Sequence, residues 1–200
     1  MNPLASLVQE HRIITRLADS LEVYAQRLLA DPNAAPREDL TRFVAVLEGL
    51  VDHIHHEKEE SVLLPFVVRH GFDWDSGSVP EVRREHRQER YLMDVLAQAC
   101  EQSTEWSADD RRHAAETALA VVEFERAHLA MENRELFPEL LARLGESESR
   151  ELARQLEIFE PGTSRRNVRQ WVGYAEELIA DYPGLGRLRA LRTAPASMTT

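Results

Sequence analysis

A histidine, followed by a glutamate four residues later and a proline ten residues later, occurs twice in this 200-residue chain. The first copy pairs His55 with Glu59, and the second pairs His128 with Glu132. Residues i and i+4 lie on the same face of a helix, so each imidazole can converge with its carboxylate on one point. This repeated pair constrains the fold to long helices whose polar positions face one another.

The prolines decide the register of the first copy. His56 and Glu60 also have the i+4 spacing, so the pair could be read one residue later. Pro65 lies ten residues after His55, as the proline of the second copy lies ten residues after its histidine. We therefore take His55, and not His56, as the repeated histidine.

A second repeated element precedes each copy. The tripeptide Glu-His-Arg occurs at residues 10–12 and again at 85–87. Its histidine, His11, precedes the histidine of the first copy by 44 residues, and His86 precedes that of the second by 42. The chain thus contains two halves of similar length. Each half brings two histidines and one glutamate, which together predict a site for two metal ions.

Apolar residues at spacings of three and four predict four long helices, each with the repeated residues in its apolar seam. We expect these helices from residue 3 to the Asp31-Pro32 pair, from residue 36 to Gly71, from 80 to 102 and from 107 to 144. Two shorter helices follow at 147–159 and 165–180. The predicted fold is all-α, an antiparallel up-down-up-down four-helix bundle with additional C-terminal helices. The domain prediction is a bundle over 1–145, a helical extension packed on it over 146–182, and a flexible tail over 183–200.

Composition narrows the possible partners. The formal net charge is −11, whereas nucleic acids and anionic membranes both require a basic face, so neither is expected as a partner. The sequence has no apolar run long enough for a transmembrane helix and no signal-peptide pattern at its start, which predicts a cytoplasmic protein. Cys100 is the single cysteine, so neither a disulfide framework nor a cysteine-ligated cluster is expected. The oligomeric state is left open.

Two interpretations of the histidines and glutamates compete. The ordinary one is that they form solvated ion pairs on exposed helix faces. The apolar seams that run through them argue against it, because an unpaired ionised glutamate is rarely buried. A bound metal ion compensates the free-energy cost of burying ionised glutamates. Six ligands are more than one tetrahedral zinc ion needs, which favours more than one ion. The predicted metal ligands are His11, His55, Glu59, His86, His128 and Glu132.

These motifs, their order and their spacing resemble hemerythrin-like proteins of the HHE cation-binding family over roughly residues 4–145. The resemblance implies a non-haem di-iron site with an oxo or hydroxo bridge. It implies that His11 and His55 hold one iron, that His86 and His128 hold the other, and that the two glutamates bridge. It further implies a protein that binds or senses O₂ or NO, with a small diatomic molecule or peroxide as its ligand.

The sequence departs from the oxygen-carrying hemerythrins in two places. Those proteins have a fifth histidine one turn after the ligand on the third helix, where this chain has Arg90. They also carry a His-x-x-x-x-Asp element where this chain has His-x-x-x-Glu. We therefore expect the iron near His86 to have one more open position, which favours reactivity with O₂, NO or peroxide over reversible oxygen storage.

Other functions remain open. One is a di-iron enzyme that acts on peroxide or in iron–sulfur cluster repair, although repair proteins of this type often carry an additional cysteine-bearing N-terminal domain. Another is a ferritin-like carboxylate oxidase built on Glu125-x-x-His128, but its second copy would be Asp52-x-x-His55 and it leaves His11 and His86 without a role. A dinuclear zinc hydrolase is the third.

Several neighbouring residues have more than one interpretation. Asp52 and Glu125, each three residues before a predicted ligand, could accept the N–H of a ligand histidine or be solvated acids. Glu89 could be an additional ligand, a proton relay or the ion-pair partner of Arg90, and we favour the ion pair. The remaining histidines are expected at the surface: His53, His56, His70 and His113.

Overall fold

All elements in the described part of the chain are helices. The computed structural model describes residues 2–31, 34–101, 105–159 and 165–184. In chain order the helices are α1 (Ala5–Ala30), α2 (Arg37–Val46), η2 (Leu47–His56), η3 (Glu59–Leu63), α3 (Leu64–Arg69), α4 (Ser78–Glu101), α5 (Ala108–Met131), η4 (Glu132–Leu136), α6 (Phe137–Arg143), α7 (Glu146–Ile158) and α8 (Arg165–Asp181).

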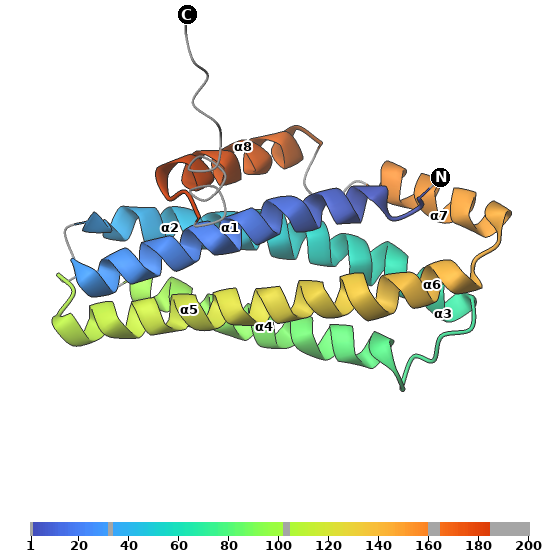
Figure 1. Ribbon diagram of the computed structural model, residues 1–200, viewed down its shortest axis with the longest axis horizontal. Coiled ribbons are helices and arrows are strands. Elements are labelled where there is room, and N and C mark those ends of the chain that lie inside the picture. Colours follow the sequence, from blue (N-terminus) through green and yellow to red (C-terminus); the bar gives the residue numbers. More distant parts are fainter. Residues whose placement is uncertain (1, 32–33, 102–104, 160–164, 185–200) are drawn as a thin grey trace, which may run out of the picture.

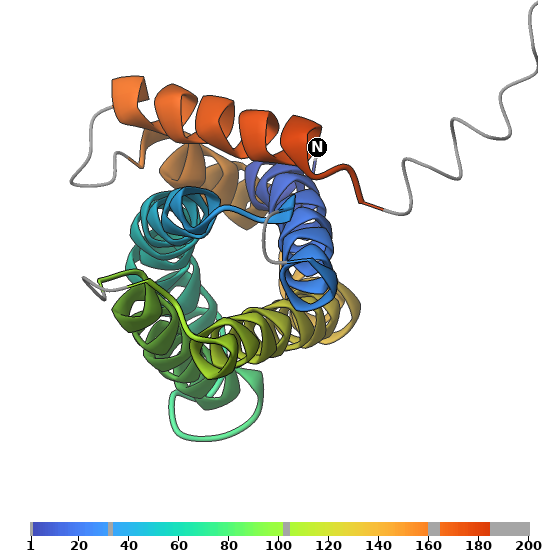
Figure 2. The same ribbon diagram turned by 90° about the vertical axis from the view of Figure 1, so that its left-hand side faces the viewer.

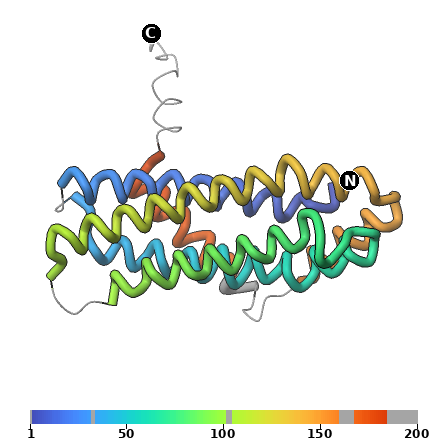
Figure 3. Tube along the Cα trace, turned by 90° about the horizontal axis from the view of Figure 1, so that it is seen from below, coloured from blue at the N-terminus to red at the C-terminus, as the bar shows by residue number. Residues whose placement is uncertain are grey.

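Four long rods run side by side and alternate in direction (Figures 1 and 3). The first rod is α1, the second is the continuous run from α2 through η2 and η3 to α3, the third is α4, and the fourth runs from α5 through η4 to α6. Seen end on, these rods stand at the corners of a square, with α8 outside it (Figure 2). The predicted fold class, an all-α bundle, is confirmed.

The apolar core is divided along the bundle. One cluster of buried side chains includes Ile14 and Leu129 and fills one end, and a second cluster includes Leu7 and Leu136 and fills the other. His11 lies on α1 between Leu7 and Ile14, so the predicted ligands occupy the layer between the two clusters. Each fully buried leucine stabilises the fold by about 1.5–3 kcal/mol, so the bundle has its own stability on either side of the polar layer.

Three segments of the second and fourth rods are π-helical, with hydrogen bonds from residue i+5 to residue i. Segments η3 and η4 begin at Glu59 and Glu132, and each is followed by a proline two residues after its end, Pro65 or Pro138. Proline has no N–H to complete the regular helical pattern, which explains why the pattern shifts at these points. The two predicted bridging glutamates therefore occupy equivalent local structures.

The predicted start of the fourth helix is confirmed in detail. The Ser107 hydroxyl accepts the backbone N–H of Asp110, and the Asp110 carboxylate accepts the backbone N–H of Ser107. This reciprocal arrangement is a capping box, in which two N–H groups that lack helical partners are satisfied.

The C-terminal helices pack against the bundle. Helix α8 lies against α1, α2 and η2, and α7 lies against η3 and α1. A Cβ atom on Gly49 would lie 2.2 Å from the ring of Trp171, so the close approach of α8 requires glycine there. The division into a bundle and an extension stays a prediction, and most of the tail predicted over 183–200 lies outside the described residues. No described helix combines the length and the apolar character that a membrane span requires.

Candidate metal centre

The six predicted ligands come from all four rods and meet in the middle of the bundle. His11 is on α1, the first His-x-x-x-Glu pair is on η2 and η3, His86 is on α4, and the second pair is on α5 and η4. All six side chains are buried, with between 0 and 3% of their surface exposed. Solvated ion pairs on exposed faces are therefore ruled out for these residues.

Each glutamate lies between histidines of the two halves. The Glu59 carboxylate is 3.7 Å from Nε2 of His55 and 3.4 Å from Nε2 of His86. The Glu132 carboxylate is 3.7 Å from Nε2 of His128 and 3.3 Å from Nε2 of His11. Because both carboxylates reach both halves, each is positioned to bridge two ions.

The donor atoms form two compact sets that share both glutamates. His11 and His55 offer one set together with Glu59 and Glu132, and His86 and His128 offer the other with the same two carboxylates; within each set the donor atoms lie within 4.8 Å of one another. This pairing agrees with the one that the family resemblance implies.

His56 corrects the sequence analysis, which expected it at the surface. Its side chain is 0% exposed, and its ring stacks on that of His86 with 3.9 Å between centroids. It forms a third compact donor set with His86 and His128. Of the other three histidines expected at the surface, His53 and His113 are exposed, whereas His70 is half-buried.

Both histidines of this adjacent pair face the core. Consecutive side chains on a helix point about 100° apart, and both can be buried where the core covers more than one face of the helix, as with Val121 and Val122 on α5. His55 and His56 lie at the end of η2, a π-helical segment, and both are buried. The helical periodicity used to read the sequence does not describe such a segment. The one feature of the sequence that could have indicated a buried His56 is its position next to His55.

Carboxylates behind the rings fix their orientation. Nδ1 of His55 donates to Glu10 at 3.1 Å and Nδ1 of His128 donates to Glu85 at 2.8 Å. A carboxylate can only accept, so each Nδ1 carries a proton, and each Nε2 is the nitrogen that faces the centre. These acceptors are the first residues of the two Glu-His-Arg elements. The repeat is visible in the sequence, but the role of its two glutamates is not.

Asp52 and Glu125 do not accept from the histidines for which they were considered. Asp52 binds Nε of Arg90 at 2.6 Å and lies 3.6 Å from Nδ1 of His56. Glu125 is buried, and neither of its carboxylate oxygens has a hydrogen-bond partner within the described residues. His86 instead donates from Nδ1 to Glu60 at 2.8 Å.

The expected ion pair between Glu89 and Arg90 is wrong. Arg90 binds Asp52 and Glu60, the latter at 2.9 Å, and points away from the centre. Glu89 points inward, is 0% exposed, and has a carboxylate oxygen 3.4 Å from Nε2 of His56. The two residues are neighbours in sequence but lie on different faces of α4, which explains why proximity in sequence misled the prediction.

Protons balance the buried charges of the centre. Burial opposes the charged form of His55, but Glu59 and Glu10 outweigh it and raise its pKa to about 9. Burial likewise opposes the charge of His128, but Glu132 and Glu85 raise its pKa to about 10. Burial and the neighbouring histidines lower the pKa of His56 well below its usual value, whereas burial and the Glu125 carboxylate raise that of Glu89 well above it.

The unsatisfied atoms fit a bound cation. Within the described residues, Nε2 of all five buried histidines and both oxygens of Glu59 and Glu132 have no hydrogen-bond partner. Buried polar groups are normally paired, so these inward-facing atoms leave a large unmet demand. A metal ion meets it, because neutral imidazoles and ionised carboxylates are its ordinary ligands.

Comparison with known families agrees with this site. The family model described as the hemerythrin HHE cation-binding domain matches residues 2–140. No curated protein matches the chain. The matched region contains both Glu-His-Arg elements, both His-x-x-x-Glu pairs and the helices that carry them. The chain therefore belongs to the hemerythrin HHE cation-binding domain family.

Proposed function

We propose that this protein holds two non-haem iron ions and uses them to bind or sense O₂ or NO. The observation that supports this proposal most strongly is the pair of buried glutamates, Glu59 and Glu132, each within 3.7 Å of a histidine from either half of the bundle. Carboxylates shared in this way are suited to two ions close together, and a one-ion site would have no need of both.

The proposed ligands divide unequally between the two ions. His11 and His55 hold the first ion, and His86 and His128 hold the second. His56 adds a third imidazole to the second ion, because it shares a donor set with His86 and His128. The two carboxylates of Glu59 and Glu132 serve both ions.

This division of the ligands changes which of the two ions is expected to have an open coordination position. The departure at Arg90 suggested that the iron near His86 lacks a ligand, but His56 supplies an imidazole on that side. We propose that an external ligand binds on the side of His11 and His55, where fewer protein donors are available. A pair of iron ions supplies the redox chemistry and the open coordination positions at which such a ligand binds.

The surrounding carboxylates prepare the histidines for this role. Glu10, Glu60 and Glu85 accept from Nδ1 of three of the histidines and hold their Nε2 atoms toward the centre. Such outer partners fix the ring orientation and raise the basicity of the ligand. Lys58 in turn pairs with Glu10, which neutralises a carboxylate that would otherwise add to the negative charge.

Turnover of peroxide is the second candidate function, and Glu89 favours it. This buried carboxyl lies 3.4 Å from His56, and burial together with the Glu125 carboxylate raises its pKa well above the usual value, which favours its protonated form. Decomposition of two H₂O₂ molecules into two H₂O and one O₂ needs no external reductant but moves protons between oxygen atoms, so a carboxyl close to the ions suits that reaction.

An optical spectrum of anaerobically purified, iron-loaded protein separates these functions. New bands on addition of NO or O₂ support ligand binding, and removal of peroxide at many equivalents per chain, lost in Glu89→Gln, supports turnover. Protein that retains zinc rather than iron after growth with both metals, and stays colourless with all three ligands, would contradict both.

A further inference from the structure

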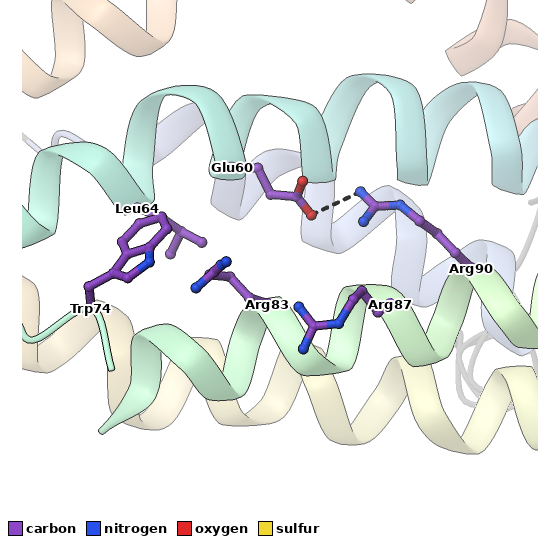
Figure 4. A pocket seen from close by; sticks show the side chains of 6 residues that line it. All are labelled: Glu60, Leu64, Trp74, Arg83, Arg87 and Arg90. Carbon is purple, nitrogen blue, oxygen red and sulfur yellow. Dashed lines mark hydrogen bonds and ion pairs between the residues drawn. The ribbon is translucent and has the colours of Figure 1, made fainter. Parts of the chain in front are cut away.

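An arginine-rich pocket opens on the outside of the bundle (Figure 4), and none of the six predicted metal ligands lines it. It has a volume of about 340 Å³, within the range of small-molecule sites. It opens between α4, the second rod and the loop that precedes α4. Its lining residues are Glu60, Leu64, Trp74, Arg83, Arg87 and Arg90.

Three arginines on one face of α4 give this pocket its charge. Arg83, Arg87 and Arg90 follow one another at spacings of four and three, so their guanidinium groups are neighbours on the helix surface. Figure 4 shows Arg90 reaching the second rod beside Glu60, whereas the Arg83 and Arg87 side chains stay closer to α4. Like charges at these spacings destabilise a helix, and the chain as a whole is strongly acidic, with a net charge of −11. A cationic cluster in such a chain calls for a counter-ion.

Carboxylates of the protein neutralise only one of the three. Arg90 binds Asp52 and Glu60. The Arg83 guanidinium lies over the ring of Trp74, 4.2 Å from its centroid, which holds the guanidinium in place without cancelling its charge. In the part of the chain that the structure describes, neither Arg83 nor Arg87 has a carboxylate within ion-pair distance. Two positive charges thus remain uncompensated in one pocket.

The metal centre does not require these arginines. In the first half of the chain, Val8 stands three residues before the repeated histidine and Thr15 stands four after it, the positions that Arg83 and Arg90 occupy in the second half. The first half nevertheless supplies its histidines to the same centre. The two additional arginines therefore belong to a feature that only the second half possesses.

We propose that this pocket binds a small molecule that carries two negative charges on one or two oxyanion groups. Guanidinium groups bind phosphate and carboxylate oxygens with two parallel hydrogen bonds, and two of them match a dianion. Leu64 and the exposed edge of Trp74 supply an apolar wall for the rest of the molecule. A phosphate monoester and a dicarboxylate are the two sources of such a group.

The pocket also shares a residue with the surroundings of the metal centre. Glu60 binds Arg90 at 2.9 Å and accepts from Nδ1 of His86 at 2.8 Å. The pocket therefore adjoins a carboxylate that orients one of the predicted ligands.

Titration calorimetry of the full-length protein tests this proposal with three probes: phenyl phosphate, inorganic phosphate and succinate. We expect saturable binding of one molecule per chain by at least one dianion, weakened by added salt. Arg87→Gln should weaken it by about tenfold or more, since it removes a charge-assisted hydrogen bond. Arg84→Gln is the matched control, because Arg84 is on the same helix, pairs with Glu81 and does not line the pocket.

The outcomes separate clearly. Binding of phenyl phosphate alone identifies a phosphate ester, binding of succinate alone a dicarboxylate, and either result supports the pocket when Arg87→Gln weakens it and Arg84→Gln does not. Absence of saturable binding by all three probes, or equal weakening by both substitutions, overturns the proposal. Arg87 is exposed, so its variant is expected to fold, and an unchanged melting temperature verifies that.

Discussion

The two halves of the bundle carry the same sequence pattern, yet they surround the centre differently. His11 and His55 lie on one side, whereas His86 and His128 are joined on the other side by His56, which comes from the first half of the sequence. The distribution of ligands in space is thus set by the local shape of the helix and not by the repeat. A duplicated sequence can produce a centre with two unequal positions.

The surroundings of the two positions differ as well. The His11 ring stacks on Phe137 with 5.2 Å between centroids, and Ile14, three residues after His11, is buried in the apolar core. The corresponding residue after His86 is Glu89, which is equally buried but carries a carboxyl group. The side of His11 and His55 is therefore lined by apolar side chains, whereas the side of His86 and His128 also holds a buried carboxyl group.

Removal of a repeated histidine should have the largest effect. We expect His55→Ala and His128→Ala each to lose at least one of two iron ions, because each imidazole faces a shared carboxylate. The exposed His113 provides the control, and His113→Ala should keep full metal content. Metal analysis of desalted protein measures the result. Equal metal content in all three variants would show that the repeated histidines are not ligands.

Removal of His56 tests whether the two iron positions differ in their number of histidine ligands. His56→Ala should lose iron from the second position only, leaving about one ion per chain, because His11 and His55 do not depend on it. The adjacent exposed residue gives a matched control, His53→Ala, which should retain both ions. If His56→Ala also retains both with the wild-type spectrum, the two positions are equal in their ligands.

Loss of the metal should lower stability without unfolding the chain. Two ions, each present at a hundred times its dissociation constant, stabilise the fold by about 5.4 kcal/mol together, which corresponds to a decrease in Tm on the order of 10–20 °C after chelation. The two apolar clusters on either side of the centre retain their packing. A calorimetric scan of chelated and loaded protein measures the difference. Identical Tm values would place the metal outside the core.

The pH dependence of the metal-free protein gives a smaller effect with a defined sign. The pKa of His55 is raised from 6.5 to about 9 and that of His128 to about 10, so the fold stabilises the protonated forms. This contribution is complete below about pH 6.5 and is lost as the pH rises toward 10. Urea unfolding across that window should show falling stability for metal-free protein. The loaded protein should not follow it, because metal replaces the protons. Rising stability of the metal-free protein would contradict these shifts.

Arg90→His should have the smallest effect. Arg90 binds Asp52 and Glu60 at the outside of the centre, so the substitution removes a half-buried ion pair rather than creating a ligand. The number of azide or NO molecules bound per chain, measured by titration, should stay at the wild-type value. A reduced number would show that an imidazole at this position reaches the second ion.

The sequence was sufficient to predict the bundle and the six central residues, because both follow from a regular helical period. Four apolar seams define the rods, and the i+4 pairs within them lie on the inner faces. The repeat supplied an internal check that a single motif lacks. The start of the fourth helix at residue 107 was predicted as well, since the residues of its capping box, Ser107 and Asp110, are close together in the chain.

The remaining parts of the site depend on departures from that period or on contacts between rods. His56 is buried beside His55 at the end of the π-helical segment η2, and apolar spacing does not reveal that both histidines face the core. Glu10 and Glu85 reach histidines on neighbouring rods, 45 and 43 residues away in the chain. An ion pair between Glu89 and Arg90 was predicted because the two residues are adjacent in the sequence, which does not show the direction in which each side chain points. Each of these required the arrangement of the rods in space.

The Mössbauer spectrum of protein reconstituted with iron-57 tests the central claim most directly, because it counts iron environments as well as iron. The account of two unequal positions predicts two iron ions per chain in two distinct environments of equal area, with one environment lost in His56→Ala. A single environment, or no more than one iron per chain in fully reconstituted wild-type protein, would contradict it.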